Sequence, residues 1–139
     1  MKWRTVQGGW VIVLATGDDV LDCLRRVARE AGILSGSLSG LGAVNGLQLA
    51  YWDQARREYL RTDLDGDHEI GALAGNITQL DGEPMVHAHA VVAGRDLVAR
   101  TGHLMAARCA ATVEIFVHDY ATEIRRAPDP DIGLNLCKL

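Results

Sequence analysis

Residues 81–92 of the chain read DGEPMVHAHAVV, a turn signal followed by a strand signal. Asp81-Gly82 is a dipeptide typical of tight hairpins, and the segment before it, Ile70–Leu80, is a long strand candidate. The segment after it, Met85–Val92, alternates in the way that a strand with two different faces does. This stretch therefore predicts two antiparallel strands joined by a short turn.

Further strand candidates lie on both sides of this hairpin, bounded by residues that favour turns. They are Trp10–Leu14, Ile33–Leu41, Leu47–Trp52, Glu58–Arg61, Ala111–His118 and Gly133–Leu139. One segment has helical spacing instead: the apolar residues of Val20–Ala31 follow two acidic residues and precede Gly32, a usual helix stop. We therefore expect residues 1–139 to form a single α+β domain, with one main amphipathic helix packed on a mostly antiparallel sheet.

The composition is that of an ordinary globular protein. Hydrophobic residues make up 48% of the 139 residues and charged residues 23%, which disfavours a disordered chain. Fourteen Lys and Arg stand against 18 Asp and Glu, a net charge of −4, whereas proteins that hold a phosphate backbone usually carry a basic excess. The densest basic positions are pairs, which we expect on the solvated surface: Arg25-Arg26, Arg56-Arg57 and Arg125-Arg126.

Cysteine usage favours a reducing compartment. Cys23, Cys109 and Cys137 are odd in number, widely spaced and without a C-x-x-C pair, so neither a disulfide framework nor a thiolate zinc site is expected. The N-terminal residues lack the apolar segment of a signal peptide, and no apolar run approaches the length of a membrane span. These features predict a cytoplasmic protein that does not enter a membrane.

Three histidines form the pattern that carries chemistry. His87 and His89 are two residues apart on a predicted strand, so their side chains project from one face. His103 follows a turn that returns the chain toward that strand and can supply a third nitrogen. Three neutral imidazoles leave a zinc ion one open position, as in catalytic or ligand-binding sites. The alternative is a hydrogen-bonded histidine stripe on a half-solvated sheet, and we assign no role to His68 and His118.

In its ordered series of motifs the chain resembles the plants-and-prokaryotes-conserved (PPC) domain, which accompanies AT-hooks in plant nuclear proteins and stands alone in prokaryotes. The matching pieces follow the helix and run through most of the chain. They are Ser39–Val44, Tyr51–Asp53, Glu69-Ile70, Gly75–Ile77, Asp81–Pro84, His87–His89, Gly102–Leu104, Thr112–Glu114 and Gly133-Leu134. The resemblance implies an antiparallel sheet with one helix, a homotrimer, and one zinc ion per subunit bound by His87, His89 and His103.

The chain departs from the family pattern at two places. Thr101 stands where the family usually has a glycine before Gly-His-Leu, which affects the turn that presents the third ligand. Residues 66–70 read GDHEI where plant members have GRFEI, so a plant-type partner surface is not carried over. No Arg-Gly-Arg-Pro AT-hook is present, and with the acidic charge we do not expect DNA as a tight direct partner.

The roles of two polar residues near the motifs, Glu114 and Asn76, each have two interpretations. Glu114 lies in an apolar strand, where it is either a base or second acceptor near the metal or an outward or intersubunit charge. Asn76 either lines the pocket or bonds the backbone at a bend. The tryptophans Trp3, Trp10 and Trp52 are not interleaved with basic residues, so we expect them in the core or in subunit contacts rather than as a nucleic-acid stacking surface.

The sequence thus predicts a zinc-binding homotrimer that binds or senses a small ligand at an open three-histidine site. The first alternative is a zinc-dependent hydrolase or lyase, with Glu114 as the candidate catalytic base. The second alternative is a DNA-associated regulatory protein, which only the plant relatives suggest. No organic cofactor is predicted, and the sequence leaves open whether the protein is an enzyme.

Overall fold

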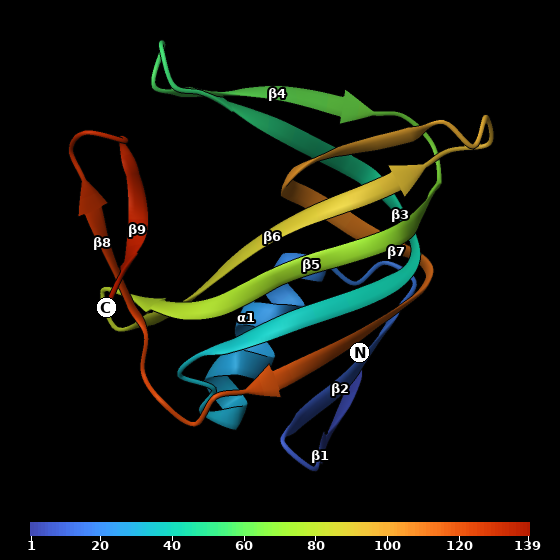
Figure 1. Ribbon diagram of the computed structural model, residues 1–139. Coiled ribbons are helices and arrows are strands. Elements are labelled where there is room, and N and C mark those ends of the chain that lie inside the picture. The colour runs from blue at the N-terminus through green and yellow to red at the C-terminus, as the bar shows by residue number, and fades with distance from the viewer.

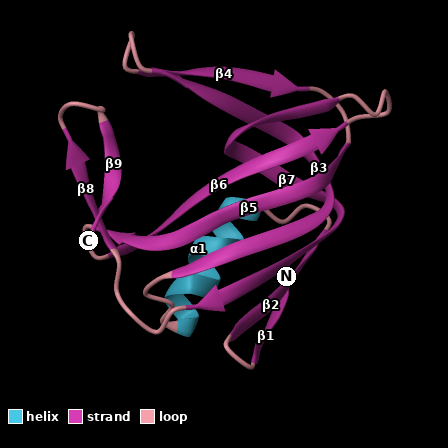
Figure 2. Ribbon diagram, in the orientation of Figure 1, coloured by secondary structure: helices cyan, strands magenta, loops and turns pink.

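Nine strands and one helix account for most of the chain in the computed structural model, which describes residues 1–139 (Figures 1 and 2). The strands are β1 (Lys2–Val6), β2 (Gly9–Ala15), β3 (Gly36–Asp53), β4 (Glu58–Leu64), β5 (His68–Leu80), β6 (Glu83–Ala93), β7 (Ala99–Asp119), β8 (Arg125–Asp129) and β9 (Leu134–Lys138). The helix α1 (Val20–Ala31) is the only one. The molecule is therefore mostly β-sheet, as the sequence predicted, but its helix is a short element rather than a main one.

The sheet curves until four of its strands close into a ring. β3 pairs with β5, β5 with β6, β6 with β7, and β7 again with β3. The remaining strands attach to this ring as hairpins or edges: β1–β2 on β7, β4 on β3, and β8–β9 on β5. All strand pairings are antiparallel except the single β5–β8 bridge between Gln79 and Arg125, which confirms the mostly antiparallel prediction.

Capping residues determine where the helix α1 begins and where it ends. The carboxylate of Asp19 accepts a hydrogen bond from the Asp22 amide at 2.9 Å, which caps the first turn. Gly32 has φ +68°, the left-handed conformation that ends many helices, and its N–H donates to the last turn. The apolar face of the helix packs against β6 and β7 and joins a core of 25 buried residues. The helix predicted at Val20–Ala31 is confirmed.

Three of the predicted segments belong to two strands that are longer than expected. Ile33–Leu41 and Leu47–Trp52 both fall largely within β3, and the candidate at Ala111–His118 is the second half of the 21-residue β7. The reason lies in bulges, which let a strand bend without ending. At one of them Gly42 has φ +144°, and a side chain there would meet the carbonyl oxygen of Thr112. For these three segments the sequence pattern identified strands but not how far the strands continue.

Two strands at the ends of the chain were not predicted. β1 pairs with β2, and β8 pairs with β9 to form a hairpin that stands beside the ring (Figure 1). β8 was not predicted because its sequence, RRAPD, has no alternation of apolar and polar residues. It also contains a proline, which is uncommon inside a strand. The cysteines are all free, as expected. The single helix is too short to cross a membrane.

Candidate metal centre

His87, His89 and His103 meet on the face of the ring that points away from the core. On β6 the neighbours Val86, Ala88 and Ala90 are buried, so alternation directs the two β6 histidines to the other face. His103 on β7 is the direct cross-strand partner of His89. The third histidine therefore arrives through strand pairing, as the sequence predicted from a returning chain.

Glycines allow the strands around these histidines to approach closely. A Cβ at Gly102, just before His103, would lie 2.9 Å from the carbonyl oxygen of Ala50 on β3. A Cβ at Gly75 on β5 would collide with the carbonyl oxygen of His87. Real Cβ atoms do not tolerate such contacts with backbone, so both glycines are needed where they are. Thr101, the departure from the family motif, does not prevent His103 from reaching the cluster.

The three imidazoles have the separation that a shared ion requires. One nitrogen from each ring lies within 4.8 Å of the other two, and the ring centroids are 5.0 to 5.4 Å apart. Tetrahedral bonds of about 2.0–2.1 Å would place the nitrogens roughly 3.4 Å apart, so small side-chain rotations suffice. In addition, Nδ1 of His103 is buried without a hydrogen-bond partner. A buried ring nitrogen without a hydrogen-bond partner, next to two other imidazoles, fits a metal site. A metal ion bound by the three rings would compensate for the missing hydrogen bond.

The surroundings of His87 and His103 favour the neutral form of these two imidazoles, which is the form that binds metal. Burial, followed by the proximity of His87 and His89, lowers the pKa of His103 to about 4. Burial also lowers the pKa of His87, and the positive charge of Arg126 acts in the same direction. Desolvation and neighbouring cations disfavour imidazolium. At neutral pH these rings therefore present lone pairs rather than protons.

Arg126 of β8 brings a fixed positive charge to the histidines. Its Nη2 lies 3.4 Å from Nδ1 of His87 and donates to Oδ1 of Asn76 at 2.9 Å. Its Nε donates to Oγ1 of Thr78 and its Nη1 to the carbonyl oxygen of Asn135, both at 2.8 Å. Asn76 is the cross-strand neighbour of His87. Asn76 is not among the residues that line the groove, but its side chain accepts the hydrogen bond that orients this guanidinium.

A broad groove of about 1060 Å³ contains the histidine cluster. Its floor is formed by the ring strands, and its walls by β4 and the β8–β9 hairpin, which lie above β6 and to its left in Figure 1. Tyr59 of β4 packs on His103 with ring centroids 5.0 Å apart, and Trp52 packs on Tyr59 at the same separation. Trp52 thus lines the groove, whereas the sequence predicted a place in the core or in a subunit contact.

Glu114, the candidate base, is not brought to the histidines. It lies on the same strand as His103 but eleven residues further on, where its cross-strand neighbours are Val13 and Leu41. Its side chain is exposed, and it does not line the groove. Alternation turns it outward, since Val113 and Ile115 on either side are buried. Within one chain the structure thus corrects the assignment of Glu114 as a base and leaves the alternative, an outward or intersubunit charge.

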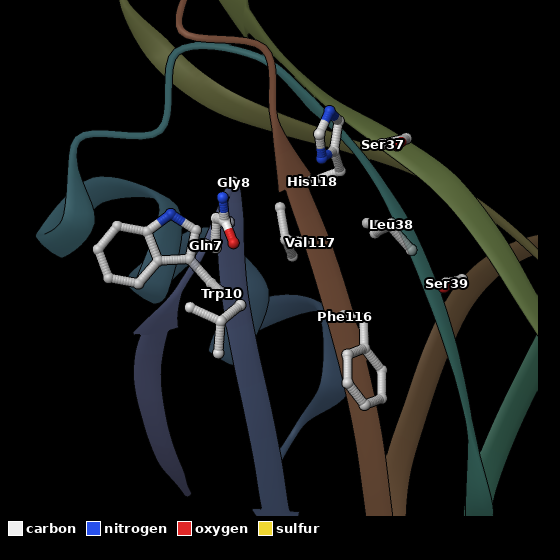
Figure 3. Close-up of a pocket in the computed structure, with 11 residues that line it drawn as sticks. Gln7, Gly8, Trp10, Ser37, Leu38, Ser39, Phe116, Val117 and His118 are labelled. Carbon is white, nitrogen blue, oxygen red and sulfur yellow. The ribbon is translucent and has the colours of Figure 1, made fainter.

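The two histidines without an assigned role also lie elsewhere. His68 is buried, with Nδ1 3.3 Å from the carbonyl oxygen of Gly66. His118 lines a separate, smaller hollow, where Figure 3 shows it on β7 beside Ser37 of β3. Neither belongs to the metal cluster.

Comparison with known proteins agrees with these features. A family model of the Plants and Prokaryotes Conserved (PCC) domain matches residues 3–121. The chain belongs to this family. The PCC match includes all three histidines and ends before β8, so Arg126 lies outside it. A search of curated proteins finds no significant match to this PCC chain.

Solved structures resemble the PCC chain over nearly its whole length. A Bacteroides thetaiotaomicron protein described as a candidate DNA-binding protein is 29% identical, with TM-score 0.95 over 99% of this chain and 96% of its own. A metal-containing protein from Archaeoglobus fulgidus is 30% identical, with TM-score 0.86 over 94% and 93%. A plant- and prokaryote-conserved (PPC) protein from Pyrococcus horikoshii is 25% identical, with TM-score 0.87 over 100% and 92%.

Sequence reasoning missed Arg126 as a site residue. The pair Arg125-Arg126 was expected on the solvated surface, which is correct for Arg125, exposed and paired with Glu123 at 2.8 Å. It is wrong for Arg126, which turns the opposite way on the same strand, is partly buried and lines the groove. The available signal was strand alternation, which sends adjacent side chains to opposite faces, but β8 itself was not predicted.

Proposed function

We propose that this PCC protein binds one zinc ion per subunit through His87, His89 and His103, assembles as a homotrimer, and uses the metal to bind or sense a small ligand. The observation that carries the proposal is the convergence of three histidine side chains, with ligand nitrogens within 4.8 Å of one another. Nitrogen donors suit zinc among the available divalent ions. The metal-containing Archaeoglobus protein, 30% identical, supports the same conclusion.

A ligand role fits this groove better than hydrolysis. A zinc ion on three imidazoles retains a position for an external donor and polarises what binds there. Hydrolysis also needs a general base within reach. The one carboxylate that lines the groove is Asp129, and its Oδ1 already accepts two backbone N–H groups, those of Asp131 and Ile132. The chain thus supplies metal ligands and an arginine, but no free carboxylate.

The metal site is tested by the zinc content of purified full-length protein. Elemental analysis should find close to one zinc per chain in protein prepared without chelator. His89→Ala should lose most of it, because two imidazoles remain. His118→Ala is the matched control, since His118 lies in the hollow of Figure 3, outside the cluster. Wild-type protein without metal, or equal loss from both variants, contradicts the proposal.

Trimer formation is supported by an apolar strand face that points away from the core. Phe116 on β7 is 53% exposed and Leu41 on β3 is 57% exposed, and Figure 3 shows Phe116 beside Ser39 of β3. Subunit pairing is a common way to cover such a face. We expect light scattering to give a trimer for wild type and a smaller species for Phe116→Glu. Leu97→Glu, in the turn between β6 and β7, is the control, and a monomeric wild type at micromolar concentration contradicts the assembly.

A DNA-associated role is the second candidate, because one similar structure carries that description. The net charge of −4 opposes it, since phosphate contacts need a basic surface. We therefore expect only weak, salt-sensitive DNA binding near physiological ionic strength. A tight, sequence-selective shift at that salt would favour the DNA role over the ligand role.

A further inference from the structure

The guanidinium of Arg126 is held in place without being neutralised. Its three hydrogen bonds, to Thr78, Asn76 and the carbonyl of Asn135, all go to uncharged oxygens. No carboxylate forms an ion pair with it, whereas Arg125, the preceding residue, pairs with Glu123. A buried or partly buried charge without a counter-ion is costly. The molecule therefore keeps a positive charge here at some expense in stability.

This charge lies directly against the metal ligands. Arg126 Nη2 is 3.4 Å from Nδ1 of His87. A divalent ion on neutral imidazoles would add two further positive charges to the same region. The carboxylate of Asp129, which also lines the groove, already has partners: its Oδ1 accepts two amides of the hairpin turn and its Oδ2 faces Lys138 Nζ at 3.9 Å. Cations gathered in one groove attract an anion.

The donors and walls of the groove indicate the kind of anion. A guanidinium has five N–H groups, and three of those of Arg126 already meet protein oxygens. One donor, on Nη1, remains free, and the second Nη2 donor lies 3.4 Å from Nδ1 of His87. The Nη2 donor becomes free when that nitrogen binds a metal or a proton, which gives the two donors that a carboxylate accepts from arginine. The opposite wall is aromatic, with Tyr59 against His103 and Trp52 behind it. An aromatic wall favours a ligand with a carbon body over a simple inorganic ion.

We propose that Arg126 is the specificity-determining residue of this groove and that it selects a small organic carboxylate, whose acid group lies between Arg126 and the metal. This inference rests on the proposed metal site and names the ligand class for it. Arg126 acts here by binding the ligand, and its bonds to Asn76 and Thr78 fix the guanidinium in advance. Such preorganisation reduces the entropy lost on binding.

The test uses full-length protein loaded with cobalt(II), whose visible spectrum reports changes at the metal. Lactate is the carboxylate probe, and lactamide is its neutral counterpart of nearly the same shape. Arg126→Gln removes the charge but keeps polar contacts to the hairpin. Arg125→Gln removes a charge one residue away, from an exposed ion pair, and is the matched control. Cobalt content is measured for every variant.

Wild type should bind lactate more tightly than lactamide. Arg126→Gln should retain cobalt and bind lactate roughly ten- to a hundredfold more weakly, the usual worth of hydrogen bonds to a charged group. Arg125→Gln should bind lactate like wild type. Equal lactate affinity in Arg126→Gln and wild type, with cobalt bound in both, overturns the inference and leaves the metal proposal standing.

Two further outcomes keep the test decisive. If wild-type protein binds no cobalt, the metal proposal and this inference fall together. If Arg126→Gln does not fold, the comparison of lactate with lactamide in the wild type becomes the test. Equal affinity of the wild type for the two compounds overturns the selection of a carboxylate. A clear preference for lactate supports it.

Discussion

The two parts of the groove that meet at His87 are built in different ways. The histidines stand on β6 and β7, inside a ring of continuous antiparallel pairing. Arg126 stands on β8, whose only strand bridge to the ring is Gln79–Arg125, and its own side-chain bonds to Thr78 and Asn76 help to hold the hairpin there. The first region is positioned by backbone and the second by side chains. The comparison indicates that one groove can combine a rigid metal platform with a more weakly attached ligand-binding element.

The largest expected difference between the two regions concerns zinc-dependent stability. A ligand that binds only the folded state stabilises it by about 4 kcal/mol at about a thousand times its Kd. Thermal unfolding with and without zinc should show this gain for wild type and for Arg126→Gln. His89→Ala should show little or none, because a ligand is missing. A gain lost equally in both variants would mean that the hairpin, and not only the ring, holds the metal.

Glycine substitutions probe how tightly each region is packed. Gly75→Ala, inside the ring, places a Cβ against the carbonyl oxygen of His87 and 2.8 Å from Ala88 Cα, so we expect a loss of about 3 kcal/mol. Gly133→Ala, in the hairpin turn at φ +82°, meets no backbone atom among its nearest contacts and should cost only about 1 kcal/mol. Urea denaturation measures both. Equal costs would contradict the difference in rigidity.

The pH dependence of the metal-free protein should reveal the buried imidazole of the ring. An unfolded histidine has a pKa of about 6.5, whereas burial lowers the pKa of His103 in the folded chain to about 4. Between these values the unfolded state binds a proton that the folded state does not, so stability should fall as the pH drops from about 6.5 to 4. Denaturation at several pH values should show a smaller fall for His103→Gln. His118→Gln, outside the cluster, should behave like wild type.

The smallest expected effect is that of Glu114→Gln. Because Glu114 is exposed and outside the groove, its substitution should leave zinc content and the affinity of cobalt-loaded protein for lactate unchanged. Elemental analysis and the same spectral titration measure both quantities. A loss of zinc or of lactate affinity would show that Glu114 contributes to the groove of a neighbouring subunit. Glu114 would then again be a candidate general base for the hydrolase alternative.

Much of the ring was predictable because its pattern is local. The Asp81-Gly82 turn, with φ +52° and +83°, joins β5 to β6 as expected, and alternation along β6 fixed the direction of His87 and His89. His103 was predictable from the returning chain, although its pairing with His89 depends on the register of β7. The series of motifs also identified the family, which the match to residues 3–121 confirms.

The hairpin was not predictable in the same way. Arg126 belongs to the groove only because distant residues, Asn76 and Thr78, accept its hydrogen bonds across about fifty positions of sequence. Neither the composition of β8 nor its charge distinguishes Arg126 from its exposed neighbour Arg125. Glu114 failed for the opposite reason: its own strand was recognised, but the length and the bulges of β7 separate it from His103. Contacts of this range require the assembled fold.

The attachment of β8 by one bridge has a thermodynamic consequence. Arg126 both fastens the hairpin, through its bonds to Thr78 and Asn135, and lines the groove with its positive charge. If its guanidinium is in place only while the hairpin is docked, an anion bound to it favours the docked state. Linkage is reciprocal, so docking raises the affinity for the anion by the same factor by which the anion stabilises docking. Occupancy of the groove and order in the last fifteen residues of the chain then become two measures of one equilibrium.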